Sequence, residues 1–91
     1  MPRRPSSPTT WEEFASQLGN ELQRRRVEAG LSQEELAHQA GMTRNYYQLL
    51  EKGRVASGAA ANPSIKVVVR LAANLGVTVD DLVPPTDRIT F

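Results

Sequence analysis

Arg44, Asn45 and Gln48 carry side chains whose paired hydrogen-bonding groups match the edges of DNA bases. Arginine can pair with both acceptors of guanine, and asparagine or glutamine with the donor and acceptor of adenine. Such pairing needs a rigid element that fits the major groove, and an α-helix has that width. We therefore expect these three residues to lie on the outer face of a short helix.

Residues 30–53 contain the elements that would position these side chains, in the sequence GLSQEELAHQAGMTRNYYQLLEKG. Ser32 and Glu35 have the spacing of a capping box, which predicts the start of a first helix. Gly41 stands where the chain must reverse, a position that favours a residue tolerating positive φ. Thr43 is the expected N-cap of the second helix. The segment is therefore predicted to be a helix-turn-helix.

The second helix of this motif is expected to turn Tyr47 and Leu50 towards the core. Leu49 would then lie on the outer side with the base-reading residues, where it either packs against a thymine methyl group or is partly buried in the protein. The hydroxyl of Tyr46 could reach a phosphate. Gln33, at the start of the first helix, has its side-chain amide beside the partial positive charge of a helix N-terminus, which predicts a phosphate contact.

The motif and its flanks resemble the Xre/Cro-type helix-turn-helix family, which includes phage Cro and repressor proteins and restriction-modification controllers. The resemblance rests on GLSQEELA, the Gly41 turn, Glu51 followed by Gly53, and LAANLGV, in the family's order, and extends over residues 14–83. It implies an all-α, five-helix, lambda-repressor-like domain with the helix-turn-helix at helices 2 and 3. It also implies a structural ion pair between Arg26 and Glu51. The stretch 53–61 is longer than the family's usual connection.

The resemblance and the helix faces together define a predicted DNA-contact set. Arg54, which follows the motif, is expected at a phosphate. The complete set is Gln33, Thr43, Arg44, Asn45, Tyr46, Gln48, Leu49 and Arg54.

The chain divides into a predicted tail at 1–9, a domain at 10–85 and a second tail at 86–91. The first tail is rich in proline and serine, which predicts disorder, although Arg3 and Arg4 there resemble a minor-groove arm. An apolar stripe predicts a helix from about Trp11 to Ala29, and Thr10 and Glu13 have the spacing of a capping box at its start. Two further predictions concern the later helices. The fourth helix is expected to face inward through Ile65, Val68, Leu71, Ala72 and Leu75. A short last helix is expected to begin at Thr78, which has capping-box spacing with Asp81.

Composition restricts the possible functions. The 91 residues carry a formal net charge of +1, which is low for a DNA-binding protein, so any basic patch must come from local arrangement. There is no cysteine, and His38 has no triad or metal-ligand partners near it in the sequence, so we expect no enzyme activity, metal or cofactor. No apolar run approaches the ~20 residues of a transmembrane helix, so a cytoplasmic protein with no membrane partner is expected.

These observations predict a sequence-specific transcriptional regulator that binds double-stranded DNA as a homodimer on a pseudo-palindromic operator. The alternative is an antitoxin or interaction module that neutralises a partner protein, and a toxin or polymerase partner stays open. Apolar residues near the C-terminus are expected to form the dimer interface, unless the last of them fold back onto their own domain. They are Val79, Leu82, Val83, Ile89 and Phe91.

Overall fold

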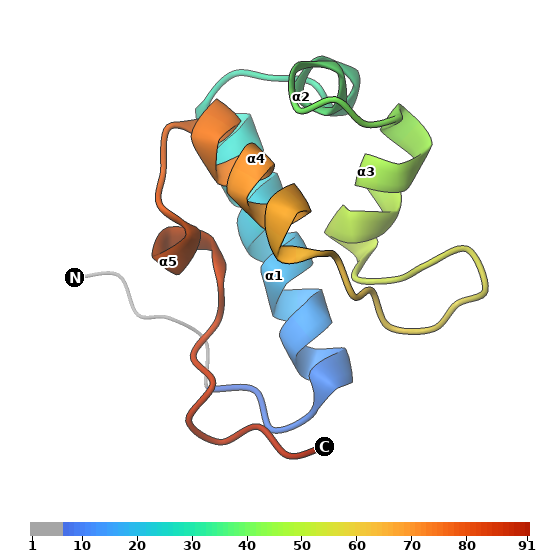
Figure 1. Ribbon diagram of the computed structural model, residues 1–91, viewed down its shortest axis with the longest axis vertical. Helices are drawn as coiled ribbons and strands as arrows, with labels where there is room; N and C mark the ends of the chain where they lie inside the picture. Colours follow the sequence, from blue (N-terminus) through green and yellow to red (C-terminus); the bar gives the residue numbers. More distant parts are fainter. Residues whose placement is uncertain (1–6) are drawn as a thin grey trace.

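The computed structural model describes residues 7–91, and within them the chain forms five helices (Figure 1). These five helices confirm the predicted all-α, five-helix fold. None of them has the length and apolar character needed to cross a membrane. In chain order the helices are α1 (Trp11–Glu28), α2 (Gln33–Gln39), α3 (Arg44–Lys52), α4 (Ile65–Leu75) and α5 (Val79–Leu82).

Every helix in this part of the chain begins at a serine or threonine whose side chain accepts a hydrogen bond from the backbone three residues on. At α1, α2 and α5 the third helical residue also accepts a bond from the cap backbone, which completes the capping boxes predicted from sequence. Local sequence therefore fixes where each helix starts. The five N-caps are Thr10, Ser32, Thr43, Ser64 and Thr78.

Helix α1 runs through the middle of the fold, and α3 packs along it at very short range (Figure 1). A Cβ atom at Gly19 would lie 2.3 Å from the backbone oxygen of Glu51, a distance that real side chains do not adopt. Gly53 ends α3 with a φ of 73°, and a Cβ there would lie 2.9 Å from the Cα of Ser16. The two glycines thus allow backbone-to-backbone contact between α1 and the C-terminal end of α3.

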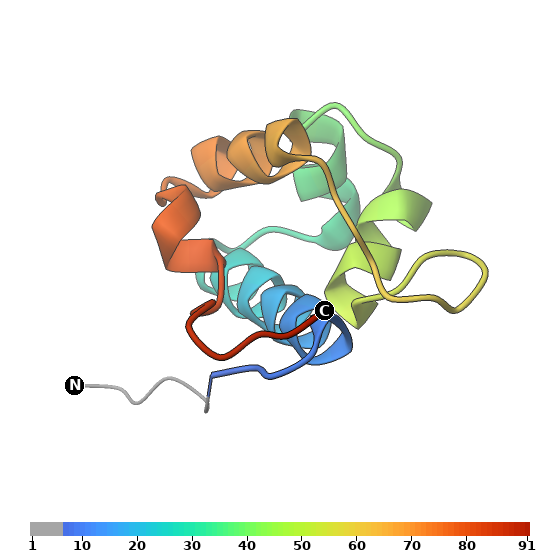
Figure 2. The same cartoon turned by 60° about the horizontal axis from the view of Figure 1, so that its bottom comes forward.

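The core lies between α1 and the remaining helices, with α4 across it from α1 and α5 on the side away from α3 (Figure 2). Val68, Leu71 and Ala72 face inward from α4 as predicted, and Leu75 is half-buried. The prediction for Ile65 is wrong, because its side chain is 75% exposed. Ile65 lies in the first turn of α4, at the edge of the buried arc.

The first described residues do not form a free tail. Pro8 is buried, and the backbone N–H of Thr90 donates to the carbonyl oxygen of Thr9 at 3.0 Å. The ring of Phe91 lies beside that of Trp11, with centroids 6.2 Å apart. The predicted disorder of residues 1–9 is therefore wrong for 7–9, because the C-terminal segment runs back alongside them. Arg3 and Arg4 lie outside the described residues.

The close approach at Gly19 yields a stability prediction. Gly19→Ala should lower the free energy of unfolding by about 3 kcal/mol, because the new methyl group meets backbone that cannot move without separating α1 from α3. Helix propensity alone would give the opposite sign. Chemical denaturation measures the change, with the exposed neighbour Asn20→Ala as the control. Equal or greater stability of Gly19→Ala would show that the helices are not in contact at this point.

Candidate nucleic-acid interface

A buried carboxylate joins the three helices that form and support the helix-turn-helix. Arg26 on α1 donates from Nε to Glu51 Oε2 at 2.6 Å and from Nη2 to Oε1 at 3.3 Å. Tyr47 donates its hydroxyl to Oε2 at 2.5 Å, and Gln33 on α2 donates from Nε2 to Oε1 at 2.9 Å. We call these four residues the Glu51 network. The structure thus brings Arg26 and Glu51 together as the sequence comparison implied.

The network settles the charge of Glu51. Burial by itself would raise the pKa of this carboxyl group, but hydrogen bonds from Arg26, Tyr47 and Gln33 outweigh burial and hold the pKa below its ordinary value. The hydrogen bond to Glu51 raises the pKa of Arg26, and burial raises the pKa of the Tyr47 hydroxyl. The carboxylate is therefore ionised and fully paired, which a buried charge requires.

Gln33 has an internal partner that the sequence analysis did not predict, and its phosphate contact stays a prediction. Its side chain is half-buried and donates to Glu51, so the amide ties the start of α2 to α3. The position at the N-terminus of α2 is as predicted. This internal bond could not be predicted from sequence, because Gln33 and Glu51 are 18 positions apart, with the whole turn between them.

The outer face of α3 presents most of the predicted base-reading residues to solvent. Thr43, Arg44, Asn45 and Tyr46 are exposed, whereas Gln48 is half-buried. Within residues 7–91, the side chains of Arg44, Asn45 and Gln48 have no hydrogen-bond partner. These three side chains are therefore free to bond with a ligand without first breaking an internal contact.

Leu49 and Tyr47 show how the inner edge of α3 is arranged. Leu49 is half-buried, which leaves part of its side chain available beside the polar face. Tyr47 is fully buried, as predicted, but its hydroxyl also serves the Glu51 network, a role that sequence reasoning missed. The i, i+4 spacing of Tyr47 and Glu51 on one helix was the available signal.

The connection after α3 forms a compact hairpin rather than an irregular loop. Arg54 pairs with Ala60 in an antiparallel bridge, and the N–H of Val55 donates to Ala59 O at 2.9 Å. The side chain of Arg54 is exposed and donates from Nη1 to Gly58 O at 3.2 Å. Arg54 is therefore held close to the end of α3, with further guanidinium donors still available.

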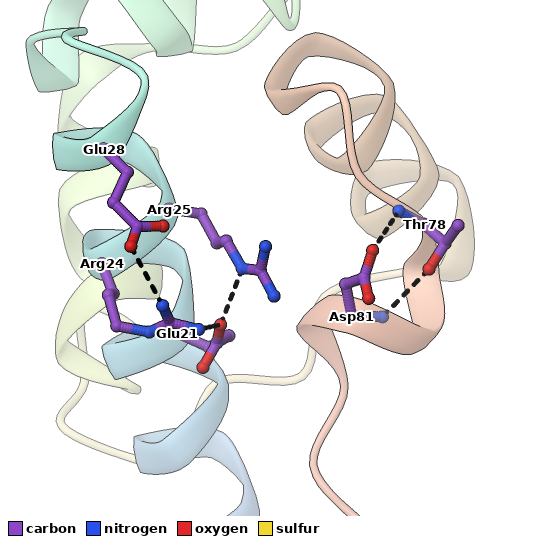
Figure 3. Close-up of polar contacts among 6 residues, drawn as sticks. All are labelled: Glu21, Arg24, Arg25, Glu28, Thr78 and Asp81. Carbon is purple, nitrogen blue, oxygen red and sulfur yellow. Dashed lines mark hydrogen bonds and ion pairs between the residues drawn. The ribbon is translucent and has the colours of Figure 1, made fainter. Parts of the chain in front are cut away.

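Two of the arginines on α1 are paired with carboxylates of the same helix. Arg24 pairs with Glu21 and, at 3.2 Å, with Glu28, while Arg25 Nε donates to Glu21 at 2.8 Å (Figure 3). Figure 3 also shows the Thr78–Asp81 capping box at the start of α5, on the neighbouring part of the fold.

Charge is distributed very unevenly along the chain. Residues 36–79 include five lysine or arginine residues and a single carboxylate, Glu51, which is buried and paired. This stretch of the sequence, which forms α3, the hairpin and α4, therefore carries exposed cations and no exposed carboxylate. The small net charge of the whole chain hides this basic region. Its cations are Arg44, Lys52, Arg54, Lys66 and Arg70.

The predicted dimer residues divide between core and surface. Leu82 is only 1% exposed and belongs to the chain's own core, so its side chain has no surface to offer a second chain, and that prediction is withdrawn. Val79, Val83 and Ile89 are half-buried. Phe91 is fully exposed although its ring lies beside Trp11.

An exposed polar helix, preceded across a glycine turn by a shorter helix and supported by a buried ion pair, defines a helix-turn-helix DNA-binding domain. The model of the helix-turn-helix family HTH_3 matches residues 22–82, and the chain belongs to this family. The chain is thus a transcriptional regulator with a helix-turn-helix DNA-binding fold.

Particular relatives agree with this assignment. The chain is 38% identical over 74 residues to the uncharacterised HTH-type transcriptional regulator y4dJ of Sinorhizobium fredii (strain NBRC 101917 / NGR234), covering 81% of this chain and 88% of the relative. The restriction-modification controller protein C.AhdI from Aeromonas hydrophila matches with a TM-score of 0.66 and 31% identity over 75% of this chain and 94% of its own.

A third relative is SinR, a master regulator for biofilm formation. Its structure in complex with DNA matches with a TM-score of 0.62 and 32% identity, covering 71% of this chain and 95% of the other. SinR in complex with the SinI protein matches with a TM-score of 0.61 and 32% identity over 71% of this chain and 58% of the other.

The Glu51 network predicts a specific pH dependence of stability. The pKa of Glu51 is lower in the folded chain than in the unfolded one, so its contribution is complete above the unfolded value of about 4.3 and is lost as the pH falls through the folded value. Glu51→Gln should cost about 3–5 kcal/mol at neutral pH, because Arg26 is left unpaired. The difference between the two proteins should shrink at acid pH. Chemical denaturation from pH 7 to pH 3 measures it, and parallel stability curves would contradict the assignment.

Proposed function

We propose that the protein is a sequence-specific regulator that binds a pseudo-palindromic DNA site as a homodimer. Arg44, Asn45 and Gln48 read base edges in the major groove, and Thr43, Tyr46 and Arg54 contact the phosphates that border it. The observation that carries this proposal is the polar face of α3, on which Arg44, Asn45 and Gln48 have no side-chain partner within residues 7–91.

Gln33 and Leu49 complete the proposed interface. The N-terminus of α2 is placed for a phosphate, with Gln33 fixed there by its bond to Glu51. The exposed part of Leu49 suits a thymine methyl group at the edge of the polar contacts.

Dimerisation follows from the modest number of available cations. Affinity for DNA that does not depend on sequence grows with the number of phosphates neutralised, and one copy offers few. Two copies on two half-sites double those contacts. We place the dimer surface on Val79, Val83, Ile89 and Phe91, and the complete exposure of Phe91 is the strongest support for that choice.

A second candidate function is binding to a regulatory protein partner. SinR forms a complex with the SinI protein, and this chain is 32% identical to SinR over the matched region. The exposed apolar residues Ile65 and Val69 on α4 provide a surface of the kind that protein partners cover. A partner that displaces the protein from DNA would support this function, whereas unchanged DNA binding would favour the DNA-only account.

Binding to duplexes selected from a random-sequence pool tests the main proposal. We expect the wild-type protein to enrich an inverted repeat, because a symmetric dimer presents two copies of α3. Arg44→Ala should weaken binding to the enriched duplex by about 1–3 kcal/mol and relax preference at one base position in each half-site. Titration monitored by fluorescence anisotropy measures the affinity.

Arg24→Ala is the matched control, since it removes an exposed arginine that is already paired with Glu21 and Glu28 on α1. Its affinity and preference should equal those of the wild type. Enrichment of no sequence would exclude specific recognition. Enrichment of a single unrepeated element would exclude the symmetric dimer, and equal effects of the two alanine variants would exclude base reading by Arg44.

A further inference from the structure

Aromatic residues gather at one corner of the fold, where the C-terminal segment returns to the start of α1 (Figures 1 and 2). The rings of Trp11 and Phe14 stack with their centroids 4.7 Å apart, and the ring of Phe91 lies 6.2 Å from that of Trp11. Phe14 is buried, whereas Trp11 is half-buried and Phe91 is fully exposed. The corner therefore presents aromatic surface that the rest of the described chain does not cover.

The exposed rings belong to a cleft of about 690 Å³. A volume of this size suits a small organic molecule, since ligand pockets in proteins range from roughly 300 to 1,000 Å³. Three segments that are far apart in the sequence meet there, namely the start of α1, the chain just before α4 and the C-terminal segment. The cleft is lined by Thr10, Trp11, Glu12, Asn62, Thr90 and Phe91.

The walls of the cleft are held in place by internal contacts. The indole N–H of Trp11 donates to the carbonyl oxygen of Ala61 at 2.9 Å, and the ring stacks on Phe14. Thr90 donates twice to the carbonyl oxygen of Thr9, from its backbone N–H at 3.0 Å and from its hydroxyl at 3.1 Å. A ligand would therefore meet a preformed site, and little affinity would be lost to reorganisation of the protein.

The charge of the cleft selects among organic molecules. Glu12 is the one charged residue that lines it, and its side chain has no hydrogen-bond or ion-pair partner within residues 7–91. The other lining residues are aromatic or are neutral and polar. The partial positive charge at the N-terminus of α1 does not reverse this preference, because the first turn also carries Glu13. The cleft therefore favours a positively charged ligand over a neutral or negative one.

We propose that this cleft binds a small organic cation that carries a flat apolar group. The apolar group packs against the rings of Trp11 and Phe91, and the cationic group lies close to the Glu12 carboxylate. Aromatic faces attract cations as well as apolar groups, and tryptophan attracts them most strongly. The site gives the protein a small-molecule ligand in addition to DNA, and it does not depend on the proposed DNA contacts.

Three small molecules with the same ring and different charges test this proposal, namely benzylammonium, benzyl alcohol and benzoate. Each is titrated into the ¹⁵N-labelled chain, and the backbone amide resonances are followed together with the indole N–H of Trp11, the single tryptophan. Benzylammonium should bind about 3–30-fold more tightly than benzyl alcohol, because it gains a cation–π contact and an ion pair. Benzoate should bind most weakly. The shifts should centre on the six lining residues.

Substitutions in the cleft supply a second test. Glu12→Gln should weaken the binding of benzylammonium about 2–5-fold and leave that of benzyl alcohol unchanged, because only the ion pair is lost. Phe91→Ala should weaken the binding of both molecules, since their ring loses an aromatic neighbour. Glu34→Gln is the matched control and should change neither affinity. Glu34 is an exposed carboxylate at the second position of α2, as Glu12 is at the second position of α1.

Three results would overturn this proposal. They are the absence of saturable shifts at the cleft, equal affinities for benzylammonium and benzyl alcohol, and equal effects of the two glutamine variants. None of these results bears on the selection of a DNA sequence, so the proposed function would stand. If the wild-type protein enriches no DNA sequence, the proposed function fails, and the titrations of the cleft decide this proposal separately.

Discussion

The buried carboxylate of Glu51 is the interaction on which the arrangement of this domain depends. An ionised carboxyl group at 9% residue exposure is tolerated only if its oxygens are paired, and its donors come from α1, α2 and α3. The three helices must therefore stay in one relative orientation for the charge to be satisfied. The glycine contact between α1 and the end of α3 brings the backbones close enough for that pairing.

This internal rigidity explains why the outer face of α3 can remain free. Hydrogen bonding within the network uses Tyr47 and Glu51 on one side of α3, whereas Arg44 and Asn45 on the other side have no internal partner. A side chain that is free but attached to a fixed helix loses little freedom when it meets a ligand. The same separation applies to charge. Arg24 and Arg25 on α1 are paired with carboxylates of the same helix, whereas Arg44 on α3 and Arg54 in the hairpin have no ion-pair partner within residues 7–91.

The sequence predicted the helices well because each helix start depends on residues three positions apart. The capping boxes at Thr10, Ser32 and Thr78 could be predicted from sequence for that reason. Predictions that depend on distant contacts failed. Leu82 was predicted at the dimer interface but lies in the core. Residues 7–9 were predicted to be disordered, because their sequence does not show that the C-terminal segment lies beside them. The partners of Gln33 and the shape of the hairpin likewise depend on where α3 ends in space.

The central claim is that α3, the start of α2 and the hairpin form one continuous DNA-binding surface. Titrating ¹⁵N-labelled protein with the duplex it selects, and following the backbone amide resonances, tests this claim most directly. The account predicts that the largest shifts cluster at residues 32–34, 43–49 and 54–58, with smaller changes at the C-terminal dimer surface. Shifts centred on α4 and the segment after α5, with α3 unaffected, would contradict it.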